Sequence, residues 1–167
     1  DIETGVPFFD HMLEAFARHA TFDLSVRATG DTEIDDHHTV EDVGIVLGLA
    51  LAQALGDKAS ITRFGDAVVP MDEALVLAAI DISGRGQLHY ALDLNTPLLG
   101  SFDTSLAKEF FMAFASNAQL SLHIYEFAGE NTHHVLEAAF KACARALRIA
   151  VARDPRIVGV PSTKGSL

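Results

Sequence analysis

The chain has 167 residues, of which 49% are apolar, and a length of this kind suits one domain or two fused half-domains. Its formal net charge of −11 disfavours a nucleic-acid partner, because such binding depends on basic side chains that displace counterions from phosphates. No run of 18 apolar residues and no basic leader segment occurs, and the single cysteine, Cys143, suits a reducing compartment, so we expect a cytoplasmic protein without a membrane partner.

The first part of the chain predicts a helix, a strand and a second helix. Residues 7–18 place apolar side chains at helical spacing, and residues 22–26 alternate apolar with polar side chains as a half-buried strand does. A long apolar run over residues 40–55 then predicts a helix of about five turns. Asp35 or Asp36 is the expected N-cap, and the glycine that follows the run is the expected stop.

The remainder begins with three strand-like segments between residues 67 and 94, separated by proline and glycine. Residues 105–118 then predict a helix, and residues 119–127 predict a strand. The sequence GENTHH marks the start of another helix, which we expect to end near Asp154 and Pro155.

Two parts of the chain repeat each other. FARHATFDLSV, residues 16–26, aligns with FASNAQLSLHI at a shift of 98, and HHTVE, residues 37–41, aligns with HHVLE at a shift of 96. An internal duplication of this kind predicts an α+β fold of two tandem half-domains, at about residues 1–92 and 93–167. No low-complexity linker separates them, so we expect one compact unit.

The two copies of the His-His-x-x-Glu motif are the strongest functional signal. On a helix, the glutamate shares a face with either histidine, whereas adjacent histidines point about 100° apart. Each pair is therefore better suited to two metal ions, or to two sides of one cleft, than to chelating one ion. A single exposed motif would be unremarkable, but two copies at equivalent points of a repeat favour a metal enzyme.

The repeat adds two further candidate ligands. At the shift of 98, His11 aligns with Glu109, so each shorter helix contributes one donor. The absence of sulfur among the donors leaves Zn²⁺, Fe²⁺ and Mn²⁺ open. The candidate metal ligands are His11, His37, His38, Glu41, Glu109, His133, His134 and Glu137.

A few basic and hydroxyl side chains are candidates for binding an anionic substrate near the metals. Arg85 lies between two glycines, which let the backbone approach a ligand closely, although a plain exposed turn explains it equally well. Arg63 is a weaker candidate, and Lys141 follows Glu137 by four residues, a spacing that also suits a structural ion pair. The tail could wrap a phosphate or be a disordered terminus. It contributes Ser162, Thr163 and Lys164.

Several long motifs resemble those of the imidazoleglycerol-phosphate dehydratase family of histidine biosynthesis. They are TGVPFFDHML, GDTEIDDHHTVEDVGIVLG, RFGDAVVPMDEAL, DISGRG, GENTHHVLEAAFKACARAL and PSTKG, and they cover nearly the whole chain. The resemblance implies two repeated halves, each a four-stranded sheet packed on helices, a fold also known from a small-subunit ribosomal protein. It further implies a hydro-lyase that converts imidazole glycerol 3-phosphate to imidazole acetol phosphate.

The resemblance also assigns roles to the candidate residues. It implies two Mn²⁺ ions per active site, shared between subunits of an assembly of about 24 copies. One ion would take His11, His38, Glu41 and His134, and the other His37, Glu109, His133 and Glu137. From the chemistry of the reaction, rather than from the resemblance, we expect Glu41 or Glu137 to be the general acid or base. The phosphate or nearby polar groups would be held by Arg63, Arg85, Lys141, Ser162, Thr163 and Lys164.

Two departures from the family pattern stand out. Glu109 occupies a position where the family has histidine, so we expect a changed ligand there rather than a lost site. The family's N-terminal strand, roughly thirty residues, is missing from this chain. The rival interpretations are a dinuclear metallohydrolase acting on a phosphorylated small molecule, and an assembly protein in which the metals only join subunits.

Overall fold

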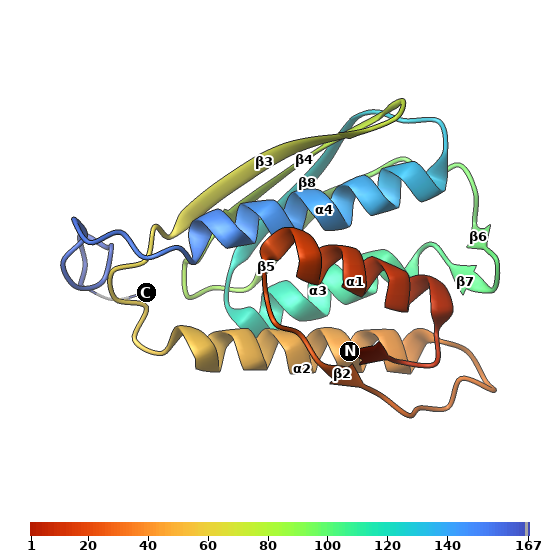
Figure 1. Cartoon of the computed structure of the whole chain (residues 1–167), viewed down its shortest axis with the longest axis horizontal. Coiled ribbons are helices and arrows are strands. Elements are labelled where there is room, and N and C mark those ends of the chain that lie inside the picture. The colour runs from red at the N-terminus through yellow and green to blue at the C-terminus, as the bar shows by residue number, and fades with distance from the viewer. Residues whose placement is uncertain (166) are drawn as a thin grey trace.

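In the described residues of this computed structural model, 1–165 and 167, four helices pack on one side of a four-stranded sheet (Figure 1). The sheet has the order β3-β4-β8-β5, and only its β5–β8 pair is parallel. The helices are α1 (Pro7–Ala20), α2 (His37–Leu55), α3 (Leu106–Ala118) and α4 (Thr132–Ala150). The sheet strands are β3 (Phe64–Met71), β4 (Ala74–Asp81), β5 (Gln87–Ala91) and β8 (Ser121–Ala128). Two short pairs complete the fold, β1 (Ile2–Glu3) with β2 (Val26–Arg27) and β6 (Leu98–Leu99) with β7 (Phe102–Asp103).

The core lies between the sheet and α4, which packs along β3 and β4. The strict alternation of buried and half-buried residues in β4 turns Val76, Ala78 and Ile80 inward, as the period of two in a strand requires. Phe140 of α4 is 1% exposed and belongs to the same core. Full burial of a side chain of this size stabilises the fold by about 1.5–3 kcal/mol. Core packing therefore fixes the position of α4, and with it the position of the second motif.

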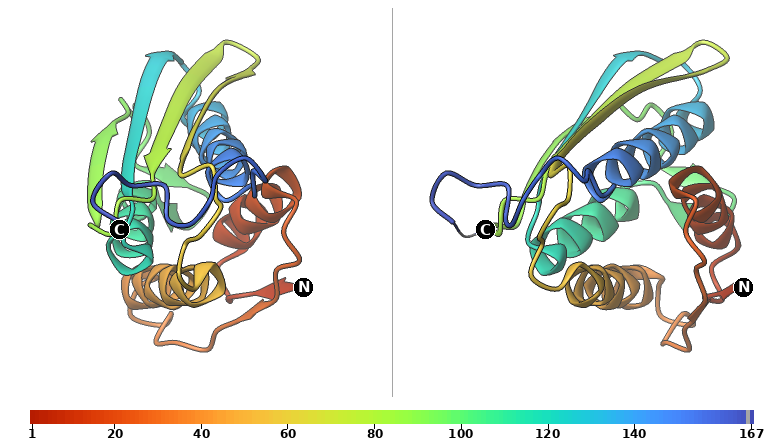
Figure 2. Two further views of the ribbon diagram at one scale, coloured as in Figure 1. Left: turned by 90° about the vertical axis from the view of Figure 1, so that its left-hand side faces the viewer. Right: turned by 60° about the vertical axis from the view of Figure 1, so that its left-hand side comes forward.

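Helix α2 lies against α3, on the side of the molecule away from the sheet (Figure 2). Gly44 and Gly48 make this approach possible, because a Cβ at either position would lie 2.8 Å or 2.7 Å from a backbone oxygen of α3. Among the described residues, α2 is the one helix long and apolar enough to cross a membrane by length and composition alone. One such helix is weak evidence for a membrane segment, and α2 packs one face on α3 with 28% of its apolar window buried.

Both motif helices begin where the sequence predicts. The Asp35 carboxylate accepts a hydrogen bond from the His37 backbone N–H (2.9 Å), and the Asn131 side chain accepts one from the His133 N–H (2.9 Å). Such bonds satisfy amides that the first turn of a helix leaves free. Gly56, with φ of +54°, ends α2. All four helices start at the same end of the molecule, opposite the C-terminal segment (Figure 1).

The α+β class is confirmed, and the repeated unit is helix-strand-helix, α1–β2–α2 and α3–β8–α4. Two details differ from expectation. Of the segment at residues 22–26, only Val26 lies in a strand, as the first residue of β2, whose parallel pair with β1 is two residues long. The four-stranded sheet also joins β3, β4 and β5, which precede the expected boundary near residue 92, to β8, which follows it. In the described residues the first half holds the β1–β2 pair rather than four strands.

Candidate metal centre

Three candidate ligands converge where α1 packs along the first turns of α4. The Oε2 atom of Glu137 lies 3.1 Å from Nε2 of His133 and 3.5 Å from Nε2 of His11. An ion with bonds of about 2.1 Å holds adjacent donors about 3 Å apart, so these distances fit a metal centre with little rearrangement. Within the described residues, no other group of three or more such side chains has its ligand atoms within 4.8 Å of one another.

The charge of Glu137 is held in place by Lys141, one turn further along α4. Nζ of Lys141 donates to Oε1 of Glu137 at 2.7 Å, which leaves Oε2 to the two imidazoles. Burial alone would raise the pKa of Glu137, but the hydrogen bond and charge of Lys141, with His133 and His11, outweigh it and lower the pKa. Glu137 is only 8% exposed and is ionised at neutral pH, as a metal-binding carboxylate must be.

The second histidine of this motif, His134, points away from that group. Its Nδ1 lies 2.8 Å from Oε2 of Glu73, in the β3–β4 turn, and its Nε2 lies 3.5 Å from Oδ2 of Asp72. The hydrogen bond from His134, together with the Asn131 backbone N–H, lowers the pKa of Glu73 to about 2, and Glu73 in turn raises the pKa of His134. As expected for adjacent histidines on a helix, the His133 and His134 side chains point in different directions.

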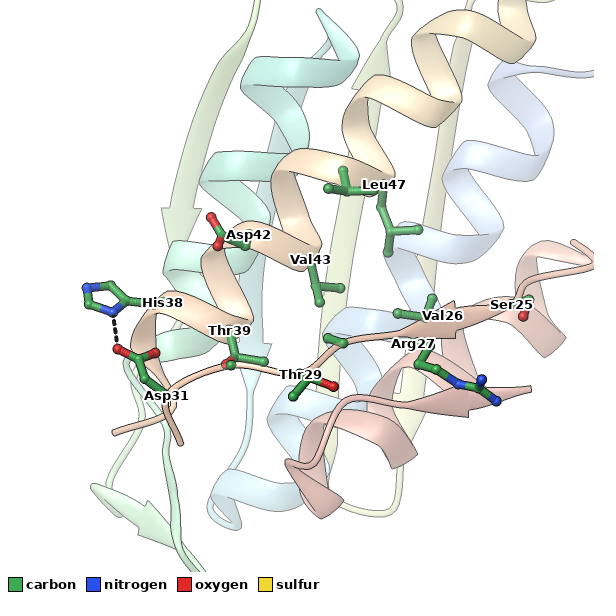
Figure 3. Close-up of a pocket in the computed structure, with 13 residues that line it drawn as sticks. Ser25, Val26, Arg27, Thr29, Asp31, His38, Thr39, Asp42, Val43 and Leu47 are labelled. Carbon is green, nitrogen blue, oxygen red and sulfur yellow. Dashed lines mark hydrogen bonds and ion pairs between the residues drawn. The ribbon is translucent and has the colours of Figure 1, made fainter. Parts of the chain in front are cut away.

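The first motif has a similar but looser arrangement at the start of α2. Nε2 of His37 lies 3.8 Å from Oε2 of Glu41. Nδ1 of His38 lies 2.9 Å from Oδ2 of Asp31, at one end of a surface hollow of about 290 Å³ between β2 and α2 (Figure 3). Asp31 raises the pKa of His38 through this hydrogen bond. Glu109 is half-buried on α3, the neighbour of α2, but it forms no group of three with His37 and Glu41.

The candidate anion-binding residues gather elsewhere. Arg63 donates through Nε and Nη2 to the two carboxylate oxygens of Asp81, at 2.7 Å and 3.3 Å, and through Nη1 to the carbonyl of Pro161 at 2.9 Å. The Arg63 side chain is only 18% exposed, and its guanidinium ties the C-terminal segment to the sheet. The spare donor capacity of Arg63 for a ligand is therefore small.

The Arg85 loop lies beside the same segment. A Cβ on Gly84 would come within 2.3 Å of Leu167, so the tail passes directly over this glycine. The tail folds into a turn in which the Lys164 N–H donates to Oγ of Ser162 at 3.2 Å. The side chains of Arg85 and Lys164 are exposed. We call the following residues the basic cluster: Arg63, Arg85, Ser162, Thr163 and Lys164.

The candidate metal ligands and the basic cluster lie at opposite ends of helix α4. Arg63 N–H bonds to the carbonyl of Ala150, the last residue of α4, whereas Glu137 lies in the helix's first turns. Glu137 and Ala150 are thirteen residues apart on this helix, which corresponds to a distance of about 20 Å. Lys141 is the candidate anion-binding residue that lies beside the candidate metal ligands within one chain, in an ion pair with Glu137. An anion site near the metals stays a prediction.

The division of the candidate ligands between two ions stays a prediction. In one chain, His11 lies with His133 and Glu137, which the family resemblance places on the other ion. Sequence reasoning missed Asp31 and Glu73, the carboxylates that contact the second histidine of each motif. Each stands in a loop with other acidic residues, and no spacing in the sequence points to the histidine that it reaches.

Comparisons with known proteins agree over nearly the whole chain. The family model for imidazoleglycerol-phosphate dehydratase matches residues 4–147. A dehydratase of this name from Acidiphilium cryptum is 62% identical over 168 residues, covering 100% of this chain and 86% of the relative. One from Desulforamulus reducens is 58% identical, covering 99% of this chain and 85% of the relative.

A solved structure gives the same result for the fold. The crystal structure of imidazoleglycerol-phosphate dehydratase from Staphylococcus aureus superposes with a TM-score of 0.86. It shares 45% sequence identity, and the match covers 91% of this chain and 86% of that one. The α+β arrangement described above is therefore one already observed by crystallography.

Proposed function

Since the chain belongs to the imidazoleglycerol-phosphate dehydratase family, the hydro-lyases of histidine biosynthesis, we propose that it dehydrates imidazole glycerol 3-phosphate using bound divalent metal ions. The product is imidazole acetol phosphate. The convergence of His11, His133 and Glu137 is the observation that supports the metal dependence. A donor set of imidazoles and carboxylates without sulfur suits Mn²⁺, and we propose two such ions per active site.

Bound metal ions would supply Lewis acidity toward the imidazole ring of the substrate. Glu137 supplies the carboxylate nearest to that chemistry. Its lowered pKa keeps it ionised at neutral pH, so it accepts a proton rather than donating one in the first step. Glu41, its counterpart in the first motif, is more exposed and is the second candidate for proton transfer.

Phosphate binding is the role that we assign to the exposed part of the basic cluster. Arg85 and Lys164 present charged groups to solvent, and Ser162 and Thr163 add hydroxyl donors in the same loop. Arg63 is already engaged with Asp81 and Pro161, so its role is to hold this loop in shape. Phosphate held in this way would position the substrate for the reaction.

One substrate molecule cannot contact both Glu137 and the basic cluster of the same chain. Imidazole glycerol 3-phosphate is a small molecule, whereas Arg63 and Glu137 are separated by about 20 Å of helix. We therefore propose that each active site combines the metal ligands of one copy with the basic cluster of another, in a closed assembly of about 24 copies. We place this assembly in the cytoplasm, where the buried thiol of Cys143 stays reduced.

The test is a product assay on protein stripped of metal by chelation. Imidazole glycerol phosphate is added with and without Mn²⁺, and the keto product and inorganic phosphate are both quantified. We expect the keto product only when Mn²⁺ is present, and no phosphate release. Phosphate without keto product would instead identify a metallohydrolase, and full turnover by the stripped protein would remove the metal dependence.

A further inference from the structure

The two histidines of each motif use different ring nitrogens. The first histidine turns Nε2 toward the glutamate of its own motif, as His133 does toward Glu137. The second histidine places Nδ1 on a carboxylate from outside its helix. Glu73 reaches His134 at 2.8 Å, and Asp31 reaches His38 at 2.9 Å (Figure 3).

A carboxylate can only accept, so the ring nitrogen that it contacts carries the proton. In His134 this leaves the lone pair of Nε2 available, and its nearest charged neighbour is Oδ2 of Asp72 at 3.5 Å. Histidines that bind metals commonly donate their other N–H to a carboxylate, which fixes the orientation of the ring and makes the ligating nitrogen more basic. The contact of Glu73 with His134 has this form.

Asp31 has no carboxylate counterpart at the equivalent position of the second motif. The shift of 96 that superimposes the motifs carries Asp31 onto Phe127, which has no carboxylate. The second motif is instead served by Glu73, from a hairpin turn 61 residues before His134 in the chain. The same kind of contact thus comes from the loop before α2 in one motif and from the β3–β4 hairpin turn in the other.

Glu73 is itself fixed at its other oxygen. Oε1 accepts hydrogen bonds from the backbone N–H groups of Asn131 (2.8 Å) and Glu130 (3.3 Å), just before α4 begins. The β3–β4 turn is thereby tied to the start of the motif helix, and Oε2 is held in place for His134. Since these backbone bonds anchor the carboxylate, the His134 ring is ordered before any ion arrives.

From these contacts we infer that Glu73, and Asp31 in the first motif, are positioning residues that present Nε2 of His134 and His38 to a metal ion. This inference rests on the proposed metal dependence. It adds residues that contact neither the ion nor the substrate. Glu73 should have the larger effect, because it is anchored to the backbone at its second oxygen.

The experiment measures Mn²⁺ affinity by competition with a chelator, without any assay of turnover. We expect Glu73→Ala to weaken binding about 10- to 100-fold. Glu73→Gln should restore only part of the loss, because its single amide oxygen can accept either from Nδ1 or from the backbone N–H groups, but not from both. Glu130→Ala is the matched control. It removes an exposed carboxylate from the same region and should leave the affinity unchanged.

A second measurement separates positioning from folding. Nitrogen NMR of the metal-free protein should show His134 protonated at Nδ1 in the wild type, and a mixture of tautomers in Glu73→Ala. Equal affinities of the wild type and Glu73→Ala for Mn²⁺ would overturn the inference while leaving the proposed function intact. A wild-type protein that binds no Mn²⁺ would overturn both.

Discussion

The backbone N–H of Arg63 donates a hydrogen bond to the carbonyl of Ala150 at 2.8 Å, at the far end of the helix that carries His133 and Glu137 in its first turns. This contact fixes the basic cluster and the metal ligands at opposite ends of one rigid element. The proposed function therefore draws the reaction chemistry and the phosphate binding of one active site from two copies of the chain. The predictions below test the parts of this arrangement separately.

Replacing Glu137 with glutamine should leave the fold intact while lowering turnover by a factor of about 10² to 10⁴, the usual contribution of a positioned acid or base. Glutamine keeps the shape of the side chain but loses the charge that faces His11 and His133. Circular dichroism and steady-state kinetics provide the measurement. Near-normal turnover would remove Glu137 from the proton-transfer role.

Removing the metal should lower thermal stability. A ligand that binds only the folded state, at about 100 times its dissociation constant, adds about 2.7 kcal/mol to the free energy of unfolding. Mn²⁺ added to the chelated protein should therefore raise the melting temperature, and the rise should be smaller in Glu137→Gln. An equal rise in both proteins would mean that the ion binds elsewhere than the centre on α1 and α4.

Arg63→Lys should loosen the C-terminal segment. Lysine cannot reproduce the paired bonds to Asp81 together with the bond to Pro161, so we expect a loss of about 1–2 kcal/mol in the free energy of unfolding. Hydrogen exchange over the residues from Pro161 to Gly165 should become faster. Arg156→Ala, which breaks an exposed pair with Asp154, is the control and should change neither quantity.

Gly48→Ala should destabilise the packing of α2, the helix that carries the first motif, against α3. The added Cβ would lie 2.7 Å from the backbone oxygen of Phe114 and 2.9 Å from the backbone nitrogen of Ala118. Because backbone atoms cannot move aside as a flexible side chain does, we expect a loss of about 1–3 kcal/mol in a denaturant titration. Gln53→Ala, at an exposed position of the same helix, should stay within about 0.5 kcal/mol of the wild type.

Local features were predictable from the sequence because they depend on near neighbours. The start of α1 at Pro7, the approach to α2 through Asp35 and the end of α2 at Gly56 follow from capping rules. The shared face of His133 and Glu137 on α4, the candidate metal-binding face, follows from their spacing. The α+β class follows from the order of these elements.

Long-range placement was not predictable in the same way. Glu73 reaches His134 only because the β3–β4 hairpin extends as far as the start of α4. Arg63 lies far from Glu137 because β3 starts beside the last turn of α4, a register that sequence spacing does not reveal. The pairing of β5 with β8 likewise placed the sheet across the expected boundary between the repeats.

The central claim, that metal ligands and basic cluster come from different copies, is tested most directly by mixing two inactive variants. Glu137→Gln and Arg85→Ala are purified separately, and their subunits are dissociated and reassembled together, with mass spectrometry confirming mixed assemblies. If each site draws on two copies, about a quarter of the sites regain both groups, and dehydratase activity returns. Confirmed mixed assemblies that remain as inactive as either variant alone would contradict the account.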